Sequence, residues 1–182
     1  MPDQLSFGFP ATGLGFADLV VTPVNESALR IVQRPENWPT PVLCLVGAPK
    51  SGLTTIAQAW AQRFGGDVFE AKSFASLKAR DVDARAAAFT AIDGADRVPA
   101  GDKVLSLINL ISGGAGRMLL TANVPPPQWQ APSADLKSRL NSMPVTEIDP
   151  PDEAMMMGRL KAAAVRHFLK LEPDVLKYLV PR

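Results

Sequence analysis

The chain has 182 residues, with 19 Lys and Arg against 18 Asp and Glu and a hydrophobic fraction of 47%. This composition is typical of a globular protein that has one large domain or one domain with a small appendage. The net charge of +1 excludes a chain that binds nucleic acid by bulk charge alone. No apolar run is long enough to span a membrane and the first residues do not read as a signal peptide, so we expect a cytoplasmic protein.

Two residue types that often carry chemistry occur only once each. Cys44 lies in an apolar run, where we expect a small buried side chain and not a redox or nucleophilic group. His167 lies beside Arg166 in a predicted helix, which favours a surface or packing role over catalysis. The sequence therefore predicts no disulfide, no cysteine metal site and no Ser/His/Asp triad.

The amino-terminal elements lead into a buried strand. Residues 1–16 are rich in Gly, Pro and Phe and predict an extended arm. We expect Asn25 to cap a helix over 26–33. Residues 42–47 (VLCLVG) form the continuous apolar run of a strand buried on both faces, and a glycine-containing loop and a predicted helix over 54–64 follow directly. This order is the opening of a βαβ unit.

The rest of the chain continues this alternation and then changes character. Apolar runs at 67–71, 86–92 and 117–121 predict strands, with helices around 73–78 and 102–111. The pattern favours an α/β fold with a parallel sheet over residues 17–148. From residue 149 onward, prolines and acids lead into a helix that runs to Leu171, and a second helix covers 175–179. We interpret 149–182 as a helical appendage.

The loop after the first strand, GAPKSGLTT, is similar to a Walker A motif, GxxxxGK[ST]. Gly47 and Gly52 suit the tight loop whose backbone N–H groups cradle phosphates, and the Thr54 hydroxyl suits Mg²⁺. Leu53 stands where the phosphate-binding lysine belongs. The lost charge-assisted contact is worth about 1.5–3 kcal/mol, which weakens nucleotide binding about ten- to a hundredfold. Lys50 is either a substitute cation or a solvated loop side chain.

An apolar strand that ends at Asp93 is the matching Walker B region. Asp93 is a candidate ligand for Mg²⁺ or its water. An active ATPase of this class has a second acid at the next position to orient the attacking water, and this chain has Gly94 there. Asp96 is either a replacement for that acid or an ordinary loop or helix-capping residue. The two departures, at Leu53 and Gly94, predict no intrinsic ATPase activity.

Several segments resemble the AAA+ domain of the bacterial initiator DnaA, and more closely the shorter DnaA regulatory inactivator (Hda) family. The resemblance runs over residues 4–182 and rests on VVTPVNESAL, LVGAPKSGLTT, AIDGAD, LLTANVPPPQW, DLKSRL and PVTEIDPPDEAMMMGRLK. It implies an AAA+ P-loop NTPase-type parallel sheet flanked by helices, followed by a small helical lid. We expect this lid to be incomplete, because the sequence stops at Arg182 before the last lid helix and its arginine.

The resemblance also implies roles for particular residues. A weakly bound or absent ADP or ATP would lie against Gly47, Lys50, Ser51, Gly52, Leu53, Thr54, Thr55, Asp93 and Asn123, with Mg²⁺ on Thr54 and Asp93. Asn123 or Thr121 would take the sensor 1 position. Arg139 would act in trans on the nucleotide of a neighbouring subunit, or else it pairs with Asp135 on an exposed helix.

The arm carries a further resemblance. Residues 4–9 (QLSFGF) are similar to the hexapeptide that binds the DNA polymerase sliding clamp, with Gln4, Leu5, Phe7 and Phe9 as the contacting residues. The implied partners are therefore the clamp and DnaA, with no sequence-specific DNA binding, no membrane contact and room for a homo-oligomer. The implied function is regulation of replication initiation by promoting ATP hydrolysis in DnaA. The alternatives are an autonomous DnaA-like ATPase and a nucleotide-independent AAA+ scaffold.

We predict that replacing both Gln4 and Leu5 by alanine abolishes clamp binding and leaves the melting temperature unchanged. Binding by short peptides concentrates its energy in a few buried side chains, and the arm contributes nothing to a predicted core. Surface plasmon resonance on immobilised clamp and a thermal melt test both halves of the prediction. Unaltered binding by the double variant would remove the arm as the contact.

Overall fold

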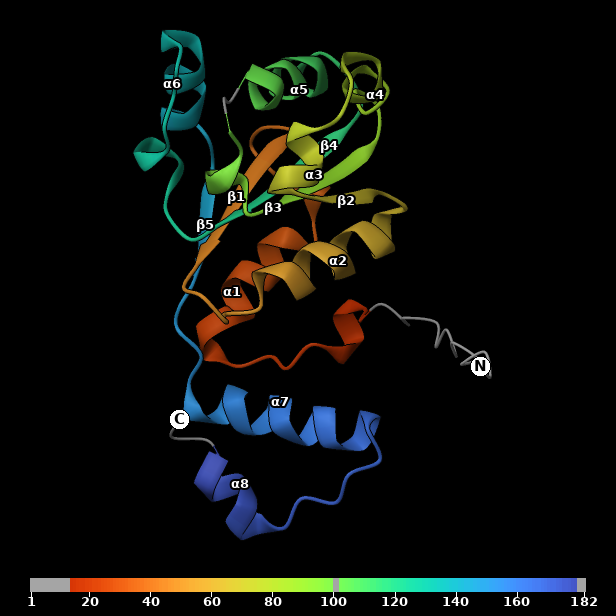
Figure 1. Cartoon of the computed structure of the whole chain (residues 1–182), viewed down its shortest axis with the longest axis vertical. Coiled ribbons are helices and arrows are strands. Elements are labelled where there is room, and N and C mark those ends of the chain that lie inside the picture. The colour runs from red at the N-terminus through yellow and green to blue at the C-terminus, as the bar shows by residue number, and fades with distance from the viewer. Residues whose placement is uncertain (1–13, 100–101, 180–182) are drawn as a thin grey trace, which may run out of the picture.

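The computed structural model describes residues 14–99 and 102–179. It contains a five-stranded parallel sheet with the order β2-β3-β4-β1-β5 (Figure 1). The strands are β1 (Val42–Gly47), β2 (Asp67–Glu70), β3 (Phe89–Asp93), β4 (Arg117–Ala122) and β5 (Val145–Ile148). The predicted α/β architecture is thereby confirmed. Because the strands are parallel, their carboxyl ends share one edge of the sheet.

Helices flank the sheet on both faces. They are α1 (Pro23–Val32), α2 (Leu53–Phe64), α3 (Ala71–Ala75), α4 (Ala79–Asp83), α5 (Asp102–Ser112), α6 (Ala134–Asn141), α7 (Glu153–Arg166) and α8 (Pro173–Leu179). One face is covered by α1 and α2, and the other by α3, α4 and α5, with α6 packed beside α5 (Figure 1). The carboxyl-terminal helices α7 and α8 lie beyond α1 and α2 (Figure 1).

Strand β1 passes through the middle of the core. All six of its residues are buried, as the continuous apolar run predicts. Leu43 and Leu45 belong to the cluster beneath α1 and α2, whereas Cys44 and Val46 belong to the cluster beneath α5. Burial on both faces fixes the position of β1, and with it the loop that follows.

Aromatic side chains hold α2 against the sheet. The rings of Trp38 and Trp60 stack at a centroid distance of 5.8 Å, and those of Phe64 and Phe89 at 5.1 Å. Trp60 is completely buried and contacts Phe64 and Phe89 as well. This cluster joins the far half of α2 to β3, so the first turn of α2 is held in a defined place at the carboxyl edge.

The start of the first helix differs from the prediction. Helix α1 begins at Pro23 with Thr22 as its N-cap, and not after Asn25. The fixed φ of proline suits the first helical position, so the helix starts earlier than the Asn signal indicates. Asn25 instead accepts a hydrogen bond from the Thr22 N–H (2.9 Å) and donates one to the Val20 carbonyl (2.9 Å). It thereby fixes the segment that precedes α1.

Three other elements also differ from expectation. Strand β5 was not expected, because only its alternate residues, Thr146 and Ile148, are buried. The helix predicted over 73–78 is replaced by two short helices, α3 and α4. Helix α7 ends at Arg166 and not at Leu171, since Phe168 adopts a left-handed conformation with a φ of 54°. His167 caps this end and is exposed, as a surface role requires.

Within the described ranges, no helix combines the length and the apolar character that crossing a bilayer requires.

We predict that the Cys44 thiol is unreactive in the folded protein. It is completely buried and free, and burial, with a smaller contribution from the charge of Asp96, raises the pKa of this thiol. Ellman's reagent should label Cys44 only as urea unfolds the chain. Labelling of the native protein at the rate of an exposed thiol would contradict the assignment.

The same raised pKa predicts a loss of stability in alkali. The unfolded thiol ionises above about pH 8.5 while the folded thiol stays protonated. Its contribution is therefore complete below that pH, and the free energy of unfolding should decrease as the pH rises further. Urea titrations of the protein and of Cys44→Ala at pH 7.5 and 9.5 test this, because the variant should lose that part of the decrease.

Candidate functional site

The loop between β1 and α2 has the tight geometry that its glycines predict. Lys50 and Gly52 both have positive φ angles, of 70° and 103°, and Gly52 is the N-cap of α2. A β-carbon on Gly47 would lie 2.6 Å from the Ser51 Oγ, so the first loop position requires glycine. Ser51 is completely buried. The loop therefore turns directly from a buried strand into the first turn of α2.

A cavity of about 480 Å³ adjoins this loop. Its volume lies within the range of small-molecule sites. The walls come from the loop, the carboxyl ends of β3 and β4, residues 14–20 and helix α7. Seven of the nine residues predicted for nucleotide binding line it, namely Lys50, Gly52, Leu53, Thr54, Thr55, Asp93 and Asn123. The remaining two, Gly47 and Ser51, contribute to the shape of the loop.

Asp93 is the centre of a hydrogen-bond network in this cavity. Its Oδ2 accepts from the Thr54 hydroxyl (2.7 Å) and its Oδ1 from the Thr121 hydroxyl (2.6 Å). The backbone N–H of Gly94 donates to the same Thr121 oxygen (3.1 Å). One carboxylate thus links the first turn of α2 to the ends of β3 and β4.

The structure brings both sensor 1 candidates to the site. Thr121 contacts Asp93 as described, and the Asn123 side-chain amide donates to the Gly47 carbonyl (2.9 Å). Asn123 therefore joins the end of β4 to the start of the loop. The resemblance left a choice between these two residues, whereas the geometry gives each of them a separate contact.

The backbone of the turn after β3 disfavours a second catalytic acid at position 94. Gly94 has a φ of 72°, and a β-carbon there would overlap the guanidinium of Arg97. Arg97 Nη1 donates to the Asn123 side-chain oxygen (3.3 Å). Asp96 Oδ2 accepts from the backbone N–H of Asn123 (3.3 Å), and its Oδ1 is buried with no hydrogen-bond partner among the described residues. Neither Gly94 nor Asp96 therefore presents a free carboxylate beside Asp93.

Leu53 has an apolar environment. It is partly buried and packs against the cluster beneath α1 and α2, and its Cδ2 lies 3.3 Å from where a β-carbon on Gly47 would be. The side chain therefore packs over the loop and against the core. The P-loop position that normally provides a cation provides packing here.

Sequence reasoning missed three cationic residues of the cavity. Arg97 lines it from the turn after β3, and Arg159 and Arg166, both on α7, line it together with the loop. Arg159 donates from Nη1 to the Lys50 carbonyl (2.7 Å) and from Nη2 to the Ser51 carbonyl (2.6 Å). Burial lowers the pKa of the Arg159 guanidinium. No local motif marks Arg159, because its partners lie more than a hundred positions away in the chain.

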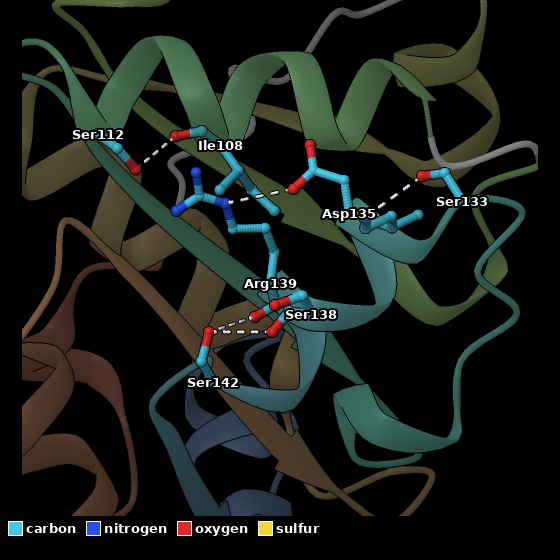
Figure 2. Close-up of polar contacts among 8 residues, drawn as sticks. Ile108, Ser112, Ser133, Asp135, Ser138, Arg139 and Ser142 are labelled. Atoms are coloured by element: carbon cyan, nitrogen blue, oxygen red, sulfur yellow. Dashed lines mark hydrogen bonds and ion pairs between the residues drawn. The ribbon is translucent and has the colours of Figure 1, made fainter.

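The predicted trans-acting arginine lies elsewhere. Figure 2 shows Arg139 on α6, a helix that Ser133 caps by accepting from the Leu136 N–H (3.2 Å). Arg139 Nε is 4.0 Å from Asp135 Oδ1, and the two side chains are 48% and 61% exposed. Arg139 is not among the described residues that line the cavity. The clamp-binding residues Gln4, Leu5, Phe7 and Phe9 lie outside the described residues.

The cavity suits a bound magnesium ion only in part. Within the described ranges, no three His, Cys, Asp or Glu side chains gather to hold a metal ion. Mg²⁺ needs fewer protein ligands, since it usually retains several waters and binds through one or two carboxylates and the substrate phosphates. The Thr54 hydroxyl and the Asp93 carboxylate, which contact one another, provide oxygens that could bind Mg²⁺.

Comparisons with known proteins give a likeness in structure alone. No protein-family model and no curated protein matches the sequence. A replication initiator DnaA bound to AMPPCP and single-stranded DNA superimposes with a TM-score of 0.71 at 18% identity, over 91% of this chain. Domain III of DnaA from Thermotoga maritima gives 0.73 at 17% identity, again over 91%.

A DNA replication initiation factor gives a TM-score of 0.76 at 18% identity, over 92% of this chain. The chain spans 59% of the first DnaA structure and of this factor, and 79% of domain III. At these identities the likeness establishes the fold, which is that of a DnaA-like AAA+ domain.

We predict that the contacts of Asp93 contribute unequally to stability. Thr121→Val removes a buried donor to Asp93 and the acceptor of the Gly94 N–H, and should lower the free energy of unfolding by about 1–3 kcal/mol. Thr54→Val is a matched control of the same shape at an exposed position and should cost less. Urea denaturation followed by circular dichroism measures both changes. Equal losses would mean that the network does not depend on burial.

Proposed function

We propose that this chain is a DnaA-like regulator of replication initiation that promotes ATP hydrolysis in DnaA instead of hydrolysing ATP itself. In this proposal the arm, through Gln4, Leu5, Phe7 and Phe9, binds the sliding clamp. Arg139 then acts on the nucleotide of a DnaA molecule packed against α6. The observation that carries the proposal is an exposed arginine placed outside the cavity, while Leu53 and Gly94 occupy the cavity positions where an active ATPase has a lysine and a second acid.

The state of the chain's own cavity supports a non-hydrolysing partner. Leu53 packs against the core, and Arg97 lies against Gly94 where a second acid would have to be. An arginine supplied in trans accelerates hydrolysis about 10³–10⁵-fold. A subunit that supplies such an arginine needs only a rigid platform and no catalytic residues of its own.

The position of Arg139 also supports this role. It projects from the last turn of α6, a helix that packs on α5 across the sheet from α7 (Figures 1 and 2). Its contact with Asp135 is long and exposed, and exposed pairs of this spacing contribute only about 0.3–0.5 kcal/mol. The guanidinium is therefore free to exchange this pair for charge on a partner's phosphates.

In this proposal adenine nucleotide binds weakly in the chain's own cavity. Lys50, Gly52, Thr54, Thr55 and Asn123 would contact it, and Thr54 and Asp93 would hold Mg²⁺, which screens phosphate charge when bound. The autonomous ATPase is the less favoured alternative, because Leu53 and Gly94 both oppose it. A nucleotide-independent scaffold would keep clamp binding and lose any response to ADP or ATP.

We predict that Arg139→Ala abolishes stimulation of DnaA. Phosphate release by ATP-bound DnaA, measured with clamp loaded on DNA, should fall to its unstimulated rate because the trans cation is lost. Clamp binding and the melting temperature should stay nearly unchanged, because Arg139 is exposed and forms one weak pair.

Two variants on the same helix serve as controls. Lys137→Ala removes an exposed cation two positions away, and Asp135→Ala removes only the partner of Arg139. Both should retain stimulation. Full stimulation by Arg139→Ala would assign the contact to another surface, and loss in all three variants would indicate a general requirement for α6 and not an arginine acting in trans.

A further inference from the structure

The first helix of the lid is fastened to the P-loop by a single arginine. Arg159 extends from the middle of α7 and donates to the carbonyls of Lys50 (2.7 Å) and Ser51 (2.6 Å). A β-carbon on Gly52 would lie 2.7 Å from Arg159 Nη2, so the guanidinium lies directly against the N-cap of α2. These contacts use only part of its hydrogen-bonding capacity, since a guanidinium has five donors.

The position of this cation is electrostatically unusual. The amino-terminal end of a helix carries a partial positive charge, which favours anions and disfavours cations. Burial opposes the charged form of Arg159 as well, as its lowered pKa records. Two carbonyl groups offset part of these costs, and an anion between the guanidinium and the helix end would offset more of them.

The cavity around Arg159 has an excess of positive charge. Four cationic side chains line it, Lys50, Arg97, Arg159 and Arg166, against the carboxylates of Asp18 and Asp93. Both oxygens of Asp93 already accept hydroxyl hydrogen bonds, and Asp18 accepts from the Gly15 N–H. Within the described residues, none of the four cations forms an ion pair. This charge distribution suits a ligand with several negative charges.

We propose that Arg159 is the phosphate-binding cation of this cavity and replaces the lysine that Leu53 displaces. The lid supplies the charge that position 53 lacks, so binding of a nucleoside polyphosphate also strengthens the contact of α7 with the loop. This inference rests on the nucleotide binding in the proposed function. It concerns the first lid helix, a different helix from the last one, to which the resemblance assigns the family's lid arginine.

Leu53 and Arg159 are therefore complementary. A lysine at position 53 would place its ammonium within the loop itself, and the lid cation would then be dispensable. With leucine there, the polyphosphate depends on a guanidinium that comes from 106 positions later in the chain. Affinity in this arrangement depends on how firmly α7 is held against the loop, because the cation is carried by a different element from the rest of the phosphate site.

The test compares charge with hydrogen bonding at position 159 in the full chain. Arg159→Gln keeps a donor for a loop carbonyl and removes the charge, whereas Arg159→Lys keeps the charge. Calorimetric titrations with ATP, and with inorganic tripolyphosphate as a ligand without base or sugar, should show about ten- to a hundredfold weaker binding for Arg159→Gln. Arg159→Lys should recover part of the loss, and Leu53→Lys combined with Arg159→Gln should recover most of it.

Lys161→Ala, which removes an exposed cation from the same helix, is the matched control and should bind normally. Hydrogen exchange gives a second readout, since ATP should slow exchange across α7 in the unaltered protein and not in Arg159→Gln. Unchanged or tighter binding by Arg159→Gln would overturn the proposal. A loss confined to ATP and not seen with tripolyphosphate would overturn it too, by placing Arg159 on the nucleoside.

Absence of any binding of either ligand at millimolar concentration would overturn this inference and the nucleotide binding in the proposed function, but not the clamp and DnaA contacts of that function. Clamp binding through the arm and stimulation of DnaA through Arg139 are measured separately and involve neither Leu53 nor Arg159.

Discussion

The carboxylate of Asp93 holds the cavity together. Its two oxygens receive hydroxyl hydrogen bonds from the first turn of α2 and from β4, so a single side chain sets the spacing between the loop and two strand ends. The Thr121 hydroxyl oxygen also accepts from the Gly94 N–H, and Arg97, in the turn that follows Gly94, donates to the Asn123 side chain. The Asn123 side-chain amide in turn donates to the Gly47 carbonyl, at the start of the loop. One chain of hydrogen bonds thus connects the loop, the first turn of α2 and the ends of β3 and β4.

The two departures from an active ATPase are built into this framework. Leu53 contributes to the core beneath α1 and α2, so its replacement by a charged residue costs apolar packing as well as gaining a cation. Gly94 has a left-handed backbone with Arg97 over it, so an acid placed there would be strained and would displace that guanidinium.

The sequence predicted the central strand and the loop because their signals are local. Six consecutive apolar residues in a strand indicate that both of its faces are buried, and the loop glycines indicate a tight turn. Strand β5 was missed because a half-buried edge strand with Thr146 and Glu147 has no apolar run. Arg159 was missed for a different reason, since its contact with the loop depends on where α7 packs and no spacing within the chain encodes that contact.

The segment before α1 has a consequence for the geometry of any assembly. Leu14 and Val20 line the cavity, and a β-carbon on Gly158 would approach Val20 to 2.6 Å, so this segment runs between the lid and the loop. Four residues lie between Phe9 and Leu14. The five Cα-to-Cα steps from one to the other span about 18 Å at most in an extended chain. If Phe9 binds a clamp, the clamp must therefore lie within about 18 Å of the cavity wall. A protein of that size so close to the cavity would sterically exclude other molecules from the same side of the domain.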